Sequence, residues 1–596
     1  MSKLVDSSAP ARPRDSGPPV VAIHRPAATL ATRAQSRGGL RRGRWVLGGA
    51  MWLGLAACHG MSGVSDLEFG QGVGSYCSAD TDCDRDIYCD LYVGRCAPQK
   101  PAGSECQEGR ECETDQCADG VCCDGPCDGF CESCAVEGSE GMCVLHPEGE
   151  DPDDECPGSA TCQGDGTCVA QHLWSYSFGD EEVDEGVAVA VDGDGNVIVA
   201  GQFQGSISFG ADPFDANSGY DVFVAKFDPD GNHLWSQRFG GGDNQYAVAL
   251  AVDGENRIVL GGHFSGTIDL DRPHDSVSYS DLYVAKLSPS GEVLWSKRFG
   301  DDGGQLLRDL DVDSAGDIAI TGTFNGTINF DGTTYDRVGT GYEDVFVAKL
   351  GADGAVLWSA AYGNDHDQEG TAVALDSAGA VVVGGWTHGA LAVGGPTLQN
   401  EGGTDIFVAK YDSDGAHAWS KRFGDSDYQY ITDVAVDSED RILLTGHFGG
   451  AVNFGGNQLS STDGLDVFVA KLAPGGGHSW SQRFGDQFDQ EARGIVVDGS
   501  DNIFVTGSFT LGIDLGGGYH ECAGDDDVFL LKLQADGTHV WSQPFGSLLS
   551  ESGRSVATDA EGNVALIGTY QHRIDLGGGA LESEGSTDAF VAKFGL

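Results

Sequence analysis

A tryptophan that returns about every 61 residues constrains this chain more than any other feature. Seven tryptophans, from Trp174 to Trp541, are separated by 61, 60, 63, 61, 61 and 61 residues. Each interval repeats the same series: an apolar run ending in Asp ("GVAVAVD"), a turn, a second apolar run ("NVIVAG"), a longer loop, and a hairpin such as "DVFVAKFDPDGNHLWSQRFG". A fixed period of this kind indicates supersecondary units that bury their apolar faces only against their neighbours.

The apolar runs have the composition and alternation of β-strands. They are rich in Val, Ile and Phe with a period of two, and the turns "DGDGN" and "DPDGN" supply Gly and Asn where a hairpin needs positive φ. We name the four strands of each unit a to d from the axis outward. Four strands repeated seven times predict an all-β chain with a seven-bladed β-propeller over residues 173–596.

The units resemble the SBBP-type β-propeller repeat, which is common in exported bacterial proteins. The resemblance covers residues 173–596 and rests on "FG", "VDxxGN" and "DVFVAKL" elements that recur in this order. It implies a propeller of four-stranded blades and implies no enzymatic activity.

The two ends of the repeat region predict how the ring closes. The first d strand, "LWSYSFG", has no c strand before it, and the last c strand, "AFVAKF" at 589–594, has no d strand after it. We expect these two strands to complete one blade, which removes the exposed sheet edges that would invite aggregation.

A cysteine-rich block precedes the propeller at 77–168. Short spacings and few apolar residues describe a segment that cannot bury a core of its own and needs covalent cross-links, so we expect up to eight disulfides. A zinc module, suggested by Cys131-Glu-Ser-Cys134, is the alternative. The predicted disulfide cysteines are Cys77, Cys83, Cys89, Cys96, Cys106, Cys112, Cys117, Cys122, Cys123, Cys127, Cys131, Cys134, Cys143, Cys156, Cys162 and Cys168.

Residues 1–57 have the features of an N-terminal extension and export signal. Arginines at 41, 42 and 44 precede an apolar run at 46–57, which is too short to span a bilayer comfortably. The sequence Leu55-Ala56-Ala57-Cys58 resembles the bacterial lipobox, which implies lipid attachment at Cys58, followed by a spacer at 58–76. We therefore expect a membrane-anchored lipoprotein at the outer membrane or cell surface. An ordinary signal peptide with an incidental Cys is the alternative.

The net charge of −58 limits the partners. Phosphate backbones are bound by clustered Lys and Arg, so such acidity argues against DNA or RNA. It favours cations or basic partners, and we expect an envelope or matrix macromolecule as ligand.

Three charged positions recur in all seven units, which indicates structural roles because a catalytic site is not needed seven times. We expect turn caps and partly buried Lys–Asp pairs. Strand a ends in Asp192, Asp253, Asp313, Asp376, Asp437, Asp498 and Asp559. Strand c begins at Asp221, Asp281, Asp344, Asp405, Asp466, Asp527 and Asp588, and carries Lys226, Lys286, Lys349, Lys410, Lys471, Lys532 and Lys593 near its end.

No catalytic constellation stands out, and we expect neither an enzyme nor a cofactor, with calcium as a possible ligand. His263, His447 and His572 lack a nearby Cys or matched carboxylate and are interpreted as solvated or capping residues. The loop at 192–203 begins like a calcium loop but has Val197 and Phe203 where Gly and Glu are required. Cys522 has no partner by count and is either free or an intermolecular link.

The links from strand d to the next strand a predict a binding face. They contain seventeen acidic residues and no Lys or Arg, and they should ring the axial funnel. We predict a non-enzymatic binding or scaffold protein that uses this rim; a merely solvated rim, or an exported enzyme with a site built from loops, is the alternative. A convergent pair of perturbed carboxylates in the funnel would favour the enzyme. The candidate rim residues are Asp180, Glu181, Asp184, Asp365, Asp367, Asp486 and Asp489.

Overall fold

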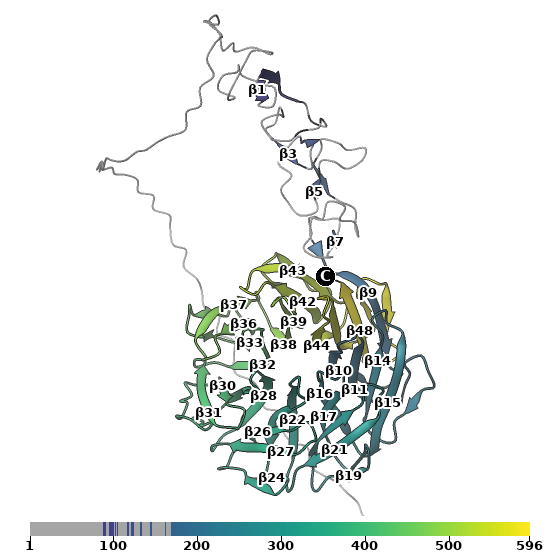
Figure 1. Cartoon of the computed structure of the whole chain (residues 1–596), viewed down its shortest axis with the longest axis vertical. Coiled ribbons are helices and arrows are strands. Elements are labelled where there is room, and N and C mark those ends of the chain that lie inside the picture. Colours follow the sequence, from purple (N-terminus) through teal and green to yellow (C-terminus); the bar gives the residue numbers. More distant parts are fainter. Residues whose placement is uncertain are drawn as a thin grey trace, which may run out of the picture. The chain divides into compact units, whose positions relative to one another are not determined.

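The computed structural model shows an all-β protein (Figure 1). It describes residues 168–595 without a break. Before them it describes the ranges 87–90, 95–100, 116–118, 121–123, 132–133, 143–145 and 161–162 and the single residues 102, 104, 106 and 112. Within these residues no helix is long and apolar enough to cross a membrane. The predicted lipid attachment at Cys58 lies outside the described residues.

Seven antiparallel blades of four strands form the propeller, as the repeat predicted, and the end of blade 1 also pairs with a ribbon of the next blade, at residues 240–242 and 267–269. Blade 1 consists of β10 (Asp184–Val191), β11 (Val197–Phe203), β14 (Asp221–Phe227) and β15 (His233–Gly242). Blade 2 consists of β16 (Gln245–Val252), β17 (Ile258–Phe264), β20 (Asp281–Leu287) and β21 (Val293–Phe299). Blade 3 consists of β22 (Gln305–Val312), β23 (Ile318–Phe324), β26 (Asp344–Leu350) and β27 (Val356–Tyr362).

The remaining blades follow the same order of strands. Blade 4 consists of β28 (Gln368–Leu375), β29 (Val381–Thr387), β30 (Asp405–Tyr411) and β31 (His417–Phe423). Blade 5 consists of β32 (Gln429–Val436), β33 (Ile442–Phe448), β36 (Asp466–Leu472) and β37 (His478–Phe484), and blade 6 of β38 (Gln490–Val497), β39 (Ile503–Phe509), β42 (Asp527–Leu533) and β43 (His539–Phe545). Blade 7 consists of β44 (Glu551–Thr558), β45 (Val564–Tyr570), β48 (Asp588–Gly595) and β9 (Gln171–Phe178).

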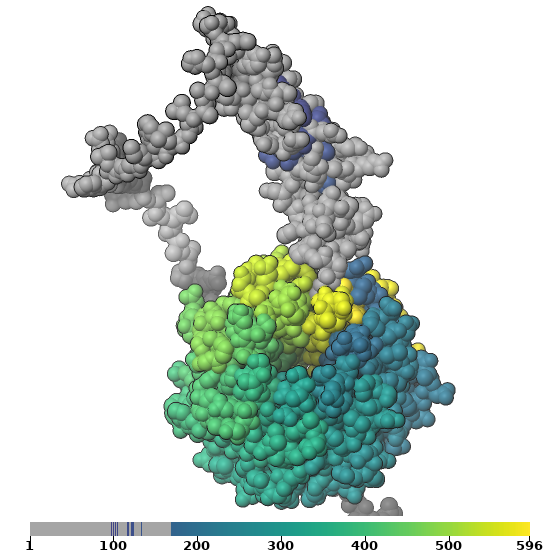
Figure 2. All heavy atoms as spheres, viewed as in Figure 1, coloured from purple at the N-terminus to yellow at the C-terminus, as the bar shows by residue number. Residues whose placement is uncertain are grey.

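The predicted ring closure is confirmed in blade 7. Strand β9, from the start of the propeller, pairs antiparallel with β48, from its end, with Phe178 opposite Ala589 and Trp174 opposite Lys593. In Figure 2 the blue atoms of the first strands accordingly lie beside the yellow atoms of the last ones. The innermost strands of neighbouring blades contact each other around the whole ring, which closes the apolar layers between blades.

The loops between strands b and c are more alike than the sequence suggested. Six of them fold into a small two-stranded ribbon, and the seventh, in blade 4, keeps a single bridge between Leu391 and Leu398. Each ribbon buries one aliphatic side chain, such as Ile268 or Ile574, in the layer between blades. The ribbon strands are β12 (Ser206–Ile207), β13 (Phe214–Asp215), β18 (Thr267–Asp269), β19 (Pro273–Asp275), β24 (Thr327–Phe330), β25 (Thr333–Asp336), β34 (Ala451–Val452), β35 (Leu459–Ser460), β40 (Gly512–Asp514), β41 (Tyr519–Glu521), β46 (Arg573–Asp575) and β47 (Ala580–Glu582).

The recurrent Lys and Asp residues form the expected pairs inside six of the seven blades. In blade 1 Lys226 Nζ lies 2.6 Å from Asp192 Oδ2, with both side chains almost fully buried. Equivalent pairs join Lys286 to Asp253, Lys349 to Asp313, Lys410 to Asp376, Lys471 to Asp437 and Lys593 to Asp559. Blade 6 differs, because Lys532 Nζ lies over the ring of Phe504, 5.2 Å from its centroid, and makes no ion pair with a described residue.

The period tryptophans join each blade to the next at the circumference. Six indole N–H groups donate to a carbonyl in the c–d turn of the following blade, as from Trp235 to Pro289 at 3.1 Å and from Trp419 to Pro474 at 3.1 Å. Trp541 of blade 6 has no such acceptor, and its indole nitrogen is buried with no hydrogen-bond partner among the described residues. Blade 7 has no c–d turn, because its c strand ends the chain and its d strand begins the propeller.

The cysteine-rich segment is described in short pieces. Disulfides join Cys106 to Cys117 and Cys112 to Cys122, and Cys123 and Cys143 are also disulfide-bonded. The sulfur atoms of Cys106, Cys112 and Cys122 lie close enough together to hold a metal ion, but disulfides already occupy them, which argues against a zinc site there. The segment's strands are β1 (Ile87–Asp90), β2 (Arg95–Pro98), β3 (Cys117–Ala118), β4 (Val121–Cys122), β5 (Glu132–Ser133), β6 (Val144–Leu145), β7 (Thr161–Cys162) and β8 (Cys168–Val169).

Candidate functional site

A β-bulge in every inner strand shapes the axial channel. In each strand a the pairing with strand b skips the fourth residue, for instance between Leu307 and Asp309 of β22. A bulged residue stands outside the ladder, and bulges commonly re-aim side chains beside functional sites. The seven bulged residues are Val187, Val248, Arg308, Thr371, Thr432, Arg493 and Arg554.

These seven residues line one cavity of about 460 Å³ on the propeller axis. Trp386, Tyr430, Ile431 and His447 complete its wall. We call this hollow the axial cavity. Because the bulged residues are the fourth residues of their strands, the axial cavity lies in the half of the channel nearest the d–a links. Its volume falls in the range typical of small-molecule sites, about 300–1,000 Å³.

Three of the seven bulged residues in the axial cavity are arginines, whereas the other four are Val or Thr. Arg308 Nε lies 2.5 Å from Glu369 Oε1, and an Arg493 terminal nitrogen lies 2.7 Å from Glu491 Oε2, while the Arg493 Nε is buried without a hydrogen-bond partner. Arg554 makes no ion pair with a described residue, and burial together with the charge of Arg493 lowers its pKa. Arg554 is therefore the one arginine of the axial cavity with no described carboxylate within ion-pair distance, although the charges of Glu185 and Glu491 act on it from farther away.

Aromatic side chains form the part of the axial cavity's wall that blades 4 and 5 contribute. Trp386 stands edge-on to Tyr430, with ring centroids 5.9 Å apart, and Tyr430 contacts His447 at 5.4 Å. The Nδ1 atom of His447 is buried without a partner, and burial lowers its pKa. In blade 2 His263 contacts Tyr246 in the same way, at 5.1 Å, and its pKa falls to about 4.

The interpretation of the histidines is wrong for two of the three. His263 and His447 lie within strand b and pair with Tyr246 and Tyr430, the second residues of strand a, so they lie at the channel rather than in solvated loops. The sequence signal that could have shown this is their position in strand b, which is the position that Trp386 occupies in blade 4. His572 fits the interpretation, because it is exposed in a turn with a φ of 64°.

Deeper along the inner strands, three carboxylates connect neighbouring blades. Asp309 accepts a hydrogen bond from the Val373 N–H at 2.7 Å, and Asp433 accepts one from the Ile495 N–H at 2.8 Å. Asp311 accepts one from the Leu375 N–H in the same way. Burial and the charge of Asp433 raise the pKa of Asp309, and burial raises the pKa of Asp433 to about 7. This pair is a singular feature of the channel, although each carboxylate is already held by two backbone N–H groups.

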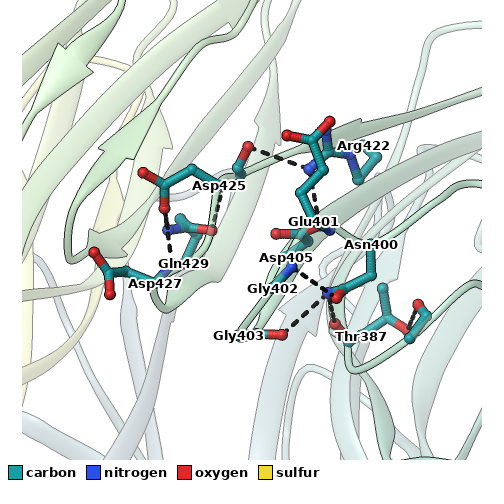
Figure 3. A network of polar contacts seen from close by, with 12 residues as sticks. Thr387, Asn400, Glu401, Gly402, Gly403, Asp405, Arg422, Asp425, Asp427 and Gln429 are labelled. Atoms are coloured by element: carbon teal, nitrogen blue, oxygen red, sulfur yellow. Dashed lines mark hydrogen bonds and ion pairs between the residues drawn. The ribbon is translucent and has the colours of Figure 1, made fainter.

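The first residue of each inner strand organises the d–a link that precedes it. In blade 5 the Gln429 Oε1 accepts the Asp425 N–H at 3.1 Å, and its amide donates to Asp425 Oδ1 at 2.9 Å (Figure 3). The nearby Arg422 pairs with Asp405 at 2.8 Å and Glu401 at 2.8 Å (Figure 3). Five blades use Gln in this position, at 245, 305, 368, 429 and 490, but blades 1 and 7 use Asp184 and Glu551.

Several carboxylates of the predicted acidic rim accept hydrogen bonds from backbone N–H groups of the d–a links and neighbouring loops. Asp184 is fully buried and accepts the Asp180 N–H, and burial raises its pKa to about 7. The Asp180 carboxylate accepts hydrogen bonds from the backbone N–H groups of Glu182 and Ser206. In the same way Asp367 accepts one from the Tyr342 N–H, and Asp489 accepts one from the Leu465 N–H. Asp486 is half-buried, and Glu181 and Asp365 are exposed. Hydrogen bonds to the backbone of the links and of the neighbouring b–c loops thus account for four of the seven carboxylates.

Two further sequence predictions concern calcium and Cys522. Among the described residues no three carboxylate or imidazole groups converge closely enough to hold a metal ion, so calcium binding stays a prediction. Cys522 is a free thiol whose pKa burial raises to about 11.

Comparisons with known proteins agree with a repeat protein. No protein-family model matches the chain. An uncharacterized WD repeat-containing protein of Acanthamoeba polyphaga mimivirus is 23% identical over 501 residues, covering 67% of this chain and 36% of the relative. The regulatory protein FlaEY of Caulobacter vibrioides is 27% identical over 338 residues, covering 52% of this chain and 34% of the relative. The chain therefore spans about a third of the length of these curated relatives.

Solved structures resemble the chain only loosely. Virginiamycin B lyase from Staphylococcus aureus has 9% identity and a TM-score of 0.35, covering 70% of this chain and 99% of that one. Sqt1 from Chaetomium thermophilum has 12% identity and a TM-score of 0.34, covering 72% and 99%. The sequence period, the sheet topology and the WD-repeat relative together make this chain a seven-bladed β-propeller repeat protein.

Proposed function

We propose that this protein is an exported, lipid-anchored binding protein of the SBBP-repeat type, whose propeller presents the axial cavity to a ligand. One observation carries the binding role: the bulged position is Val or Thr in four blades and Arg in the other three. Residues that repeat in every blade serve the scaffold, whereas a position that varies among blades is where a single specific site can be built. The proposed binding site therefore lies in the axial cavity, inside the acidic rim that the sequence predicted as the binding face.

Membrane attachment through Cys58 supports this role and is open to a direct test. A diacylated and N-acylated cysteine supplies the several chains that stable anchoring requires. The Cys58→Ser variant should move from the membrane fraction to the soluble fraction of the producing cell. A wild-type protein found in the soluble fraction would contradict the lipid anchor.

The binding role needs a separate experiment. The purified full chain, immobilised on resin, should retain an envelope or matrix component that the Arg308→Gln, Arg493→Gln, Arg554→Gln triple variant does not retain. Equal capture by the wild type and the triple variant would place binding outside the axial cavity.

An exported enzyme is the second candidate. The buried carboxylates Asp309 and Asp433, both with a raised pKa, are the specific observation in its favour, because such pairs occur in acid–base catalysis. Recovery of the captured component in chemically altered form, abolished by Asp309→Asn, would favour the enzyme over the binding protein.

A further inference from the structure

The charge of the axial cavity specifies the charge of its ligand. Arg308 and Arg493 each have a glutamate partner, whereas Arg554 has none among the described residues. A guanidinium held away from water binds a carboxylate strongly, through two parallel charge-assisted hydrogen bonds. A guanidinium with no carboxylate in direct contact is free to pair with one carboxylate group of a ligand. A phosphate dianion would bring surplus negative charge toward Asp309 and Asp433, which lie just beyond the bulge residues in their strands.

The other side chains that line the axial cavity indicate the chemistry of the uncharged part of the ligand. Val187 and Val248 line the side of blades 1 and 2, and Trp386, Tyr430 and Ile431 line the side of blades 4 and 5. Blade 7, which carries Arg554, lies across the ring from blades 3 and 4. A ligand held at one end by Arg554 therefore reaches toward an aromatic wall, where a flat ring can stack or stand edge-on.

We propose that the axial cavity binds a small aryl monocarboxylate, with its carboxylate on Arg554 and its ring against Trp386 and Tyr430. This inference rests on the proposed binding function and names its ligand class. A mostly apolar pocket with a few convergent polar groups is the usual form of a small-molecule site. Arg554 is the residue expected to discriminate most, because it alone among the three arginines of the axial cavity has no described carboxylate within ion-pair distance.

Titration calorimetry of the purified full chain with benzoate tests the proposal. We expect one benzoate per chain. The neutral isostere benzamide should bind at least about tenfold more weakly, because it cannot form the charge-assisted pair. Inorganic phosphate should also bind at least about tenfold more weakly, because it lacks the ring and carries the wrong charge. No benzoate binding, or benzamide or phosphate binding as tightly as benzoate, would overturn the proposal.

Variants assign the binding to named residues. Arg554→Gln should weaken benzoate binding by about 10- to 100-fold, in line with the loss of hydrogen bonds to a charged group. The matched control Arg573→Gln changes an exposed arginine on ribbon β46 and should leave the affinity unchanged. Arg554→Lys keeps the charge and loses the paired geometry, so intermediate affinity is expected. Unchanged affinity in a folded Arg554→Gln or Arg554→Lys protein would overturn the assignment.

The outcome also separates this inference from the proposed function. If benzoate does not bind but the wild-type chain still captures an envelope component that the triple arginine variant does not, the ligand class is wrong and the binding function stands. If neither benzoate nor any envelope component is retained, both proposals fall.

Discussion

The junction between blades 6 and 7 differs from the other blade junctions at the circumference. Elsewhere an indole N–H donates to the next blade's c–d turn, and a buried Lys pairs with an Asp. At this junction Trp541 and Lys532 have the same sequence context but lack those partners. The missing acceptor of Trp541 has a topological cause: blade 7 is completed by the last and the first strand of the propeller, so it has no c–d turn. The Asp498 that would pair with Lys532 lies in blade 6 itself, so ring closure does not account for that second exception. A residue that recurs in every blade therefore contributes differently where its partner in the next blade is missing.

The largest effect is expected from breaking the closure itself. Deleting residues 588–596 removes β48, leaves β9 and β45 without their shared neighbour, and exposes a sheet edge and apolar side chains such as Phe590 and Phe594. We expect loss of cooperative unfolding or a fall in Tm of more than 10 °C, on the order of the cost of several buried large side chains. Thermal unfolding followed by circular dichroism measures this. A truncated protein that melts at the wild-type temperature would contradict the closed ring.

A pair of lysine variants sharpens the comparison between blades. Lys226→Met should lower the free energy of unfolding by about 3 kcal/mol, because it leaves the buried Asp192 without its cation. Lys532→Met should change it far less or raise it, because Lys532 has no ion-pair partner and burial already lowers its pKa. Denaturant unfolding of both variants gives the two values. Equal losses would mean that the absence of an ion pair does not distinguish Lys532 from Lys226.

The smallest effect concerns the residue that begins strand a. Glu551 stands where five blades have Gln, and burial raises its pKa from the ordinary 4.5 to about 7. A folded-state pKa above the unfolded value means that the stability present below about pH 4.5 is lost as the pH rises to 7. Glu551→Gln should remove this loss and make the protein more stable at pH 8 by about 1–3 kcal/mol.

The converse substitution is the control for this prediction. Gln429→Glu in blade 5 should introduce the same loss of stability between pH 4.5 and 7, because it places a second carboxylate beside Asp425. Unfolding at pH 5 and pH 8 compares both variants with the wild type. If neither substitution alters the pH dependence, Glu551 is already neutralised by a partner in the folded protein.

Much of the fold was predictable because it repeats. The 61-residue period predicted seven blades, the unmatched end strands predicted the closure, and the invariant Lys and Asp positions predicted buried pairs. Repetition makes such features visible in one sequence, because seven near-copies show which residues every blade needs. The exception at Trp541 was not predicted, because it depends on a turn that blade 7 lacks. The exception at Lys532 was not predicted either, because its sequence context matches that of the paired lysines.

The sequence by itself determined the blade number, the strand order, the buried pairs and the acidity of the d–a links, since all of these follow from local patterns. Only the tertiary structure decided where the site lies. The motif "LLRDLDVD" shows an arginine in an apolar strand, but alternation alone does not say which way a residue faces. A bulge shifts the alternation at the fourth residue, and ring closure then brings Arg308, Arg493 and Arg554, from blades far apart in the chain, into one cavity.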